Sequence, residues 1–223
     1  MHRYKNIVII GTSHIARESI QEVERIISLE RPEVVALELD TARFKALLEK
    51  TKSKMRLRDI RKVGFKGWVF AFVGSFVERK LGDKVGVNPG AEMLKAAEIA
   101  QKYDCKLALI DQKIEITLKK FSNALTWKEK LRFVLDLLKA PFSKEKIRID
   151  LGKVPEEKLI HEMIQQLKKR YPNVYQVLVA DRNEYMAKNL FKLMRKVESV
   201  VAVIGAGHEK EIIHYLTVLE KAN

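Results

Sequence analysis

Short apolar runs alternate along the chain with longer segments in which apolar residues recur at helical spacing. Each run is apolar at almost every position, which is typical of strands buried on both faces of a parallel sheet. Pro32 marks the start of the second run, because a proline disfavours helix in the residue before it. The pattern predicts strands at residues 6–10, 33–38, 105–111 and 199–204.

The amphipathic segments between these runs predict helices. Thr41 and Thr126 stand where N-caps are expected, because a threonine hydroxyl can accept a hydrogen bond from a free N–H of the first turn. The predicted helices cover residues 15–30, 42–50, 90–103, 126–139, 155–171, 173–196 and 208–220. Strands that alternate with helices predict an α/β fold, with a mostly parallel central sheet and surrounding helices.

Two segments break the alternation, and we predict both as helical insertions within a single domain of residues 1–223. The segment at 119–170 contains the amphipathic helix at 126–139, one face of which carries Trp127, Leu131, Val134, Leu135 and Leu138. The segment at 50–88 begins with eight Lys or Arg within 50–66 and continues into an apolar run with a single charge, VGFKGWVFAFVGSFV.

That apolar run is too short to span a bilayer, for which about 18 residues are needed. Four interpretations stay open. The run forms a buried hairpin of an inserted lobe, an element that lies on a membrane surface, a lid over the substrate, or the surface of a homodimer.

Two strand ends share one local design. Residues 7–14 are IVIIGTSH, and residues 201–208 are VAVIGAGH. In each, a glycine permits a sharp turn or a close backbone approach, two small residues leave space, and a histidine follows. Open α/β sheets place their ligand sites at the carboxyl ends of strands. We therefore expect His14 and His208 to share one site.

The second of these stretches also resembles the start of a dinucleotide-binding unit, but the likeness fails in two places. Lys210 stands where the third glycine of that fingerprint would let the helix pack closely on the strand. The acid that binds the ribose would fall near or beyond Asn223. We expect no nucleotide at this position.

Three acids occupy strand ends or helix starts, as the two histidines do. Glu38 ends the second predicted strand, Asp111 ends the third, and Glu92 lies in the first turn of a helix. Two imidazoles and a carboxylate are common ligands of a catalytic divalent ion, and a second carboxylate can serve as general base. The pattern thus favours a metal site formed by His14, His208 and Glu38, although any one acid could simply cap a helix.

The remaining histidines give weaker signals. His161 lies in a HEM sequence that lacks the second histidine of a zinc-binding helix, because position 165 is glutamine. We expect His161 and His214 to be ordinary surface or packing residues.

Composition limits the classes of function. The chain is 47% hydrophobic, enough for a packed core, and its 43 basic and 29 acidic residues give a net charge of +14. This balance favours an anionic partner, and we expect a membrane surface but no nucleic acid, because the basic cluster adjoins a continuous apolar run. Abundant Lys and Glu resemble the surfaces of thermophile proteins. A lone cysteine, Cys105, and no signal peptide fit the cytoplasm.

The motifs together resemble the TraB/PrgY family over nearly the whole chain. The resemblance is carried by GTSH at 11–14, PEVVALELDTAR at 32–43, GAEMLKAAEIA at 90–100, LIDQKIEITL at 110–118, DRNEYMAKNL at 181–190 and VVAVIGAGH at 200–208. This family is related to the Tiki proteases and more distantly to erythromycin esterases and pheromone shutdown proteins. Many archaeal relatives carry a membrane region after this domain. This chain ends just after its final predicted helix, so we expect that such a region is absent from it.

The resemblance implies a metal or catalytic core of His14, Glu38 and His208. Other family motif positions are matched by Arg43, Glu92, Asp111 and Arg182. One position departs from the pattern, because Gln112 stands where the family tends to have an arginine. A role for that arginine in gripping a substrate carboxylate is therefore in doubt here.

The sequence favours a metal-dependent hydrolase, a peptidase that acts on peptide or pheromone-like substrates with Mn²⁺, Co²⁺ or Zn²⁺. Arg43 or Arg182 would orient carboxylates or the substrate. Two alternatives stay open. One is a non-catalytic module that binds and sequesters a peptide at the cytoplasmic face of a membrane, and the other is a metal-free, esterase-type hydrolase with a histidine base.

Overall fold

The computed structural model of the protein describes residues 1–12, 17–49, 90–139 and 157–222. His14, most of the predicted insertion at 50–88 and part of the one at 119–170 lie outside the described residues. The assignment of both segments as insertions into one domain stays a prediction. Within the described ranges, no helix is both long and apolar enough to cross a membrane.

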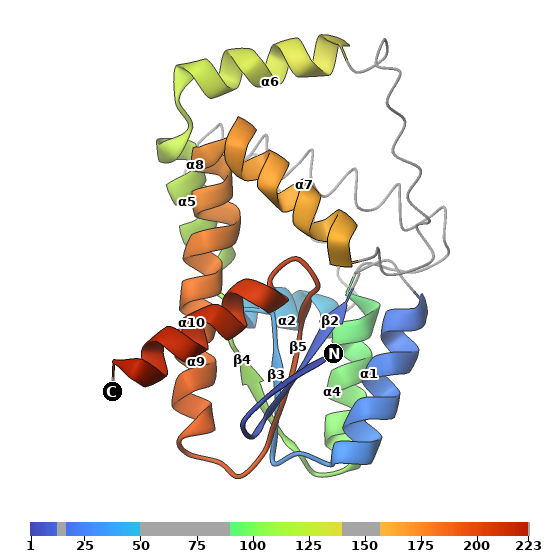
Figure 1. Ribbon diagram of the computed structural model, residues 1–223. Coiled ribbons are helices and arrows are strands. Elements are labelled where there is room, and N and C mark those ends of the chain that lie inside the picture. Colours follow the sequence, from blue (N-terminus) through green and yellow to red (C-terminus); the bar gives the residue numbers. More distant parts are fainter. Residues whose placement is uncertain (13–16, 50–89, 140–156, 223) are drawn as a thin grey trace.

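A five-stranded sheet forms the centre of the molecule (Figure 1). Its strands are β1 (His2–Tyr4), β2 (Ile7–Thr12), β3 (Val34–Leu37), β4 (Lys106–Leu109) and β5 (Val200–Gly205). Their order across the sheet is β1-β2-β5-β3-β4, and all neighbours are parallel except β1 and β2. The predicted α/β fold with a mostly parallel sheet is confirmed.

The last strand lies between the first two predicted strands. Thr12 pairs with Gly205 and Leu37 with Val203, so β2, β3 and β5 end at one edge of the sheet. All six residues of β5 are buried, which explains its apolar composition, because helices cover both faces. The two Gly-x-x-His sequences thus begin side by side.

Four helices cover the two faces of the sheet. On one face α1 (Arg17–Glu30) and α4 (Ala91–Lys102) form a core with the strands, in which Ile26, Ile27 and Met93 are buried. On the other face α9 (Asp181–Met194) and α10 (Glu209–Lys221) bury Met186, Leu190 and Ile212. The helices lie where their apolar positions predict, because each turns its apolar face to the sheet.

The remaining helices gather at and beyond the carboxyl edge of the sheet, and all of them except α2 lie toward the top of Figure 1. They are α2 (Thr41–Leu48), α5 (Ile114–Ala124), α6 (Trp127–Lys139), α7 (Glu157–Arg170), α8 (Pro172–Tyr175) and a π-helix (Gln176–Ala180) that leads into α9. This group stands over the edge at which the predicted site residues lie.

Three details differ from the sequence-based expectations. The edge strand β1 and helix α5 were not anticipated, since three residues give no periodicity and IEITL alternates like a strand. The helix predicted at 173–196 contains a π-helical segment. Thr41 is not the N-cap of α2, because Asp40 takes that place.

Candidate functional site

Glu38 is the central acid at the carboxyl edge of the sheet. It directly follows β3, and its backbone N–H still donates to Val203 O at 3.1 Å, so it extends the pairing with β5. The residue is 4% exposed. Gly205 N donates to its Oε2 at 2.5 Å, and Arg182 Nη2 donates to its Oε1. Glu38 therefore links β3 to both β5 and α9.

Arg182 reaches from α9 to the ends of two strands. Besides Glu38, its guanidinium contacts both oxygens of Asp111, with Nε to Oδ1 at 3.1 Å and Nη2 to Oδ2 at 2.7 Å. Burial lowers the pKa of Arg182, but attraction by Glu38 and Asp111 outweighs it and raises the pKa above its ordinary value. The arginine stays charged and bonds to both carboxylates.

A second arginine extends the cluster to α2. Arg43 donates from Nη2 to Asp111 Oδ2 at 2.5 Å and from Nε to Asp40 Oδ2 at 2.7 Å. Asp40 caps α2, since its Oδ1 accepts from Ala42 N at 2.8 Å and Arg43 N at 3.0 Å. This explains why Thr41 does not cap the helix. Burial raises the pKa of Asp40, but hydrogen bonds from Arg43 lower it below its ordinary value.

His208 approaches the same Glu38 oxygen that Arg182 contacts. It immediately precedes α10, and its Nε2 lies 3.4 Å from Glu38 Oε1. Its Nδ1 lies 2.5 Å from Oδ1 of Asn183, which is fully buried. Asn183 Nδ2 donates to Glu211 Oε2 at 2.7 Å, and a carboxylate can only accept, so this bond fixes the orientation of the amide.

The amide orientation decides which ring nitrogen of His208 carries the proton. Since Asn183 Oδ1 is an acceptor, His208 Nδ1 must be the donor in this pair. In the neutral ring Nε2 then carries the lone pair, and it is directed toward Glu38. His208 is thus arranged to bind a cation or to accept a proton at Nε2.

Tyr175 and Glu211 continue the hydrogen bonding of Asn183 on the side away from His208. Tyr175 OH donates to Glu211 Oε1, while Glu211 Oε2 accepts from Asn183. Burial first, and then the bond to Glu211, raises the pKa of Tyr175, so the phenol stays a donor. A continuous series of hydrogen bonds therefore runs from Tyr175 to His208.

The π-helix separates Tyr175 from Arg182 and Asn183 along the chain. A π-turn adds a residue to the helical turn, so it rotates everything after it relative to an unbroken α-helix. The widened turn sets the phase in which Arg182 faces Glu38 while Asn183 faces His208. No feature of the sequence signalled this insertion.

Gly11 confirms the close approach predicted at the first strand end. A Cβ at this position would press on the Glu209 carboxylate and lie 3.1 Å from Ala206 Cα. Ala206 N donates to Thr12 O at 2.9 Å, which closes the second Gly-x-x-His loop against the end of β2. The first loop therefore needs glycine because the second one lies against it.

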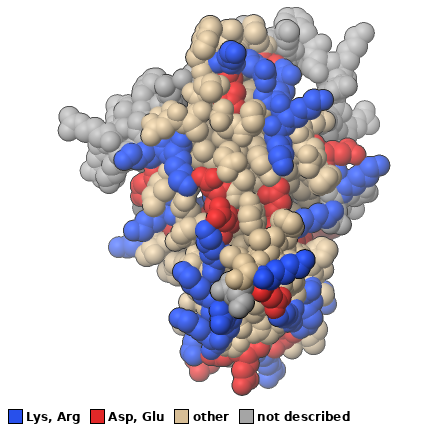
Figure 2. Space-filling view, turned by 60° about the vertical axis from the view of Figure 1, so that its left-hand side comes forward, with Lys and Arg blue, Asp and Glu red and all other residues tan. Residues whose placement is uncertain are grey.

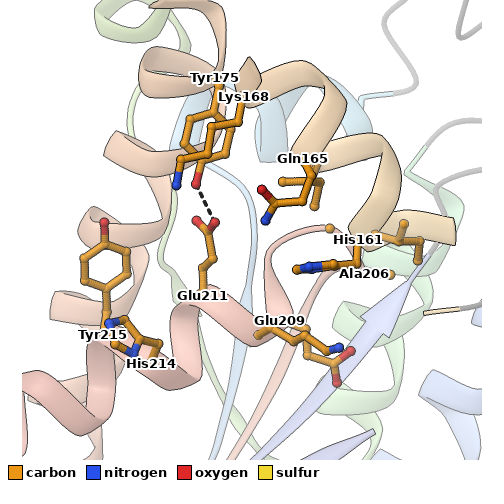
Figure 3. Close-up of a pocket in the computed structure, with 13 residues that line it drawn as sticks. His161, Gln165, Lys168, Tyr175, Ala206, Glu209, Glu211, His214 and Tyr215 are labelled. Atoms are coloured by element: carbon orange, nitrogen blue, oxygen red, sulfur yellow. Dashed lines mark hydrogen bonds between the residues drawn. The ribbon is translucent and has the colours of Figure 1, made fainter. Parts of the chain in front are cut away.

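A pocket of about 290 Å³ opens between α7 and the start of α10 (Figure 3). Its wall includes Ile160, His161, Ile164, Tyr175, Glu211 and His214. His161 and His214, expected as ordinary surface or packing residues, are exposed and both line this pocket. Glu211 belongs to the pocket wall and also accepts a hydrogen bond from Asn183, which contacts His208. The pocket therefore lies next to the residues that orient His208.

The structure thus brings together five of the seven predicted site residues, namely Glu38, Arg43, Asp111, Arg182 and His208. Glu92 is almost fully buried in the first turn of α4, and His14 lies outside the described residues. Four residues were missed, namely Asp40, Asn183, Tyr175 and Glu211. Only Asp40 and Asn183 gave a hint, as neighbours of motif positions.

Gln112 does not replace the arginine expected beside Asp111. Its side chain is buried and donates to Thr117 Oγ1 at 2.9 Å, toward α5. Its backbone N–H donates to Asp111 Oδ1 at 2.7 Å. The cations that contact Asp111 are instead Arg43 and Arg182, from α2 and α9.

A metal centre is not complete within the described residues, where no group of three or more His, Cys, Asp or Glu is arranged to hold an ion. The pair of His208 Nε2 and Glu38 Oε1 fits part of such a site. Both oxygens of Glu38 also accept hydrogen bonds, from Arg182 and Gly205.

Comparison with known proteins gives one family. The model of the TraB/PrgY/gumN family matches residues 2–223. An uncharacterized protein of Methanocaldococcus jannaschii is 39% identical over 98% of this chain and 55% of its own length. TraB domain-containing proteins of Mus musculus and Homo sapiens are 25% and 24% identical over 91% of this chain and 60% of theirs. The chain therefore spans less than two thirds of these relatives.

Proposed function

This chain belongs to the TraB/PrgY/gumN family, and from that membership and the geometry at the carboxyl edge of the sheet we propose that it is a hydrolase centred on His208 and Glu38. The observation that carries the proposal is the fixed tautomer of His208. Asn183 holds the proton on Nδ1, which leaves Nε2 to bind a cation or to act as a base beside Glu38.

In the leading form of the proposal, a divalent ion, Mn²⁺, Co²⁺ or Zn²⁺, is held by His208, Glu38 and His14. When bound, such an ion activates water and polarises the carbonyl of the substrate. Arg182 orients Glu38, and Asp111 and Arg43 keep Arg182 in place. Glu92 is the general base that the sequence suggested, but it is almost fully buried in the first turn of α4 and is not among the residues brought together here.

A metal-free hydrolase is the second candidate, and one observation favours it. Both oxygens of Glu38 already accept a hydrogen bond, which leaves fewer lone pairs for a metal and occupies Glu38 with the protein itself. In this form His208 is the base, Asn183 orients it, and Arg182 stabilises negative charge that develops on the substrate.

We propose a peptide as the substrate. The pocket between α7 and α10 lies beside the loop that carries His208, and about 290 Å³ suits one large side chain. Ile160 and Ile164 of α7 supply apolar lining, while Tyr175 and Glu211 supply polar groups. Such a pocket would hold a side chain next to the scissile bond.

Metal analysis and thermal melting test whether the protein binds a divalent ion at this site. We expect Mn²⁺, Co²⁺ or Zn²⁺ to raise the melting temperature of the wild type, since an ion that binds only the folded state stabilises it. His208→Ala, Glu38→Gln and His14→Ala should lose the shift. His214→Ala, which changes an exposed histidine of α10, should keep it. Equal shifts in all variants would rule out this metal site.

Hydrolysis is tested separately on a mixed peptide library read by mass spectrometry. Cleavage that a chelator removes supports the metal form, and cleavage that survives the chelator but is lost in His208→Ala supports the metal-free form. Intact peptides under every metal condition would contradict a peptidase.

A further inference from the structure

Helix α6 is attached to the rest of the molecule through its polar face. Glu129 accepts from Asn173 N at 3.0 Å and Asn173 Nδ2 at 2.9 Å, and it also accepts from Thr126 N at 3.2 Å. One turn further, Arg132 Nη1 donates to Arg170 O at 2.5 Å. These contacts join α6 to the junction of α7 and α8.

Asp136 continues this polar attachment. It accepts from Arg170 Nε at 2.5 Å and from Tyr171 OH at 2.5 Å. Asp136 is seven residues after Glu129, so both lie on one side of the helix, with Arg132 near them. The side of α6 that faces the protein is therefore the charged one.

Three large apolar side chains of α6 point away from the protein. Trp127, Leu131 and Leu135 are 69%, 46% and 44% exposed. They are spaced four residues apart, and on a helical wheel the centre of this group lies about 130° from the centre of Glu129, Arg132 and Asp136. We call these three residues the outer stripe of α6. An amphipathic helix on a globular protein normally turns its apolar stripe inward, so this orientation indicates a docking face.

The surroundings of the outer stripe are basic. Helices α5, α6 and α7 together contain ten Lys or Arg but only five Asp or Glu. Lys128, beside Trp127, is exposed. Among the ten, Lys120, Arg132 and Arg170 bond to other groups of the protein, and Lys168 lies over the Tyr175 ring. At the upper end of the molecule in Figure 2, basic side chains lie beside uncharged surface. The partner should thus be both apolar and anionic.

We propose that the outer stripe of α6 docks into the interface of an anionic lipid bilayer. Apolar side chains enter the boundary of the acyl chains, while neighbouring lysines meet anionic headgroups. A second copy of this chain fits less well, because two basic faces repel and three side chains fall far short of the roughly 800 Å² that a stable interface buries on each partner. This proposal does not depend on hydrolase activity.

The test is flotation of the whole chain with vesicles of phosphatidylglycerol and phosphatidylcholine, compared with phosphatidylcholine alone. We expect binding to the anionic vesicles at low salt, and a large loss at roughly 1 M salt, where the Debye length falls to about 3 Å. The double variant Leu131→Asp/Leu135→Asp should lower the partition coefficient about tenfold or more. Both positions are solvent-facing, so the variant should fold, as circular dichroism would check.

Leu29→Asp is the matched control, because Leu29 is 71% exposed near the end of α1, away from α6 in Figure 1. This variant should bind like the wild type. In a Trp68→Phe background, the fluorescence of Trp127 should shift to the blue on addition of anionic vesicles.

Three outcomes would overturn the proposal. The first is no flotation at low salt. The second is flotation that the double variant leaves unchanged, which would place the lipid contact elsewhere. The third is a dimer without lipid that the double variant dissociates, which would make a second copy the occupant.

Discussion

Gly11 shows at the scale of one residue how the two Gly-x-x-His loops depend on each other. Gly11→Ala would place a methyl group against the Glu209 carboxylate and 3.1 Å from Ala206 Cα. Because Ala206 is held by its bond to Thr12 O, the backbone can give way only at a cost. We expect the free energy of unfolding to fall by about 1–3 kcal/mol, as for other overpacked sites. Urea denaturation measures it.

Gly207→Ala is the control in the companion loop. Among the residues that the structure describes, a Cβ there would meet Ile164 Cδ1 at 3.5 Å and Ile160 Cγ2 at 4.0 Å, which are ordinary contacts. This variant should change stability by about 0.5 kcal/mol or less. If both substitutions cost the same, the close approach at Gly11 is not the reason for the glycine.

At the scale of elements, α6 depends on a capping box at its N-terminus. Glu129 N donates to Thr126 Oγ1 at 3.3 Å, and Glu129 accepts in return from Thr126 N, which confirms the predicted Thr126 cap. Burial raises the pKa of Glu129, but hydrogen bonds from Asn173 and Thr126 outweigh it and hold the pKa below its ordinary 4.5.

Glu129→Gln tests this element. A carboxyl group with a lowered pKa stabilises the fold above the pKa of the unfolded chain, and the contribution is lost as the pH falls through the folded pKa. We expect the variant to be about 1 kcal/mol less stable at pH 7, with the difference from wild type shrinking below about pH 4.5. Glu162→Gln, at an exposed position of α7, should have little effect at either pH. A loss that does not change with pH would contradict the assignment.

At the scale of the whole molecule, Arg182 joins the layer of α9 to the ends of β3 and β4. Arg182→Gln would leave Glu38 and Asp111 as buried acids without this cation. We expect a loss of about 3–5 kcal/mol in the free energy of unfolding, as for other broken buried pairs. Urea denaturation measures it, with exposed Arg195→Gln at the opposite end of α9 as the control.

A second variant identifies the source of that loss. Asp111→Asn should cost less in the Arg182→Gln background than in the wild type, because the two groups are coupled. Additive losses would mean that Arg182 stabilises the protein through packing and not through its charge.

The sequence by itself determined where the strands and most helices lie, and which residues end the strands. Glu38, Asp111 and His208 could be predicted as site candidates, because an apolar run and the residue that ends it are adjacent in the chain. The periodicity of an element depends only on residues within a few positions of one another, so it can be read without the fold. Arg43 and Arg182 were predicted from the family motifs, which can also be recognised in the sequence without the fold.

Tertiary structure alone decided which of these residues meet. Arg182 and Glu38 are 144 positions apart, and they meet because β5 inserts between β2 and β3 and because a π-turn sets the phase of α9. The tautomer of His208 depends on Asn183 and Glu211, and the outward stripe of α6 depends on the polar bonds of its other face. None of these has a local signature, because each arises from contacts between segments that only folding brings together.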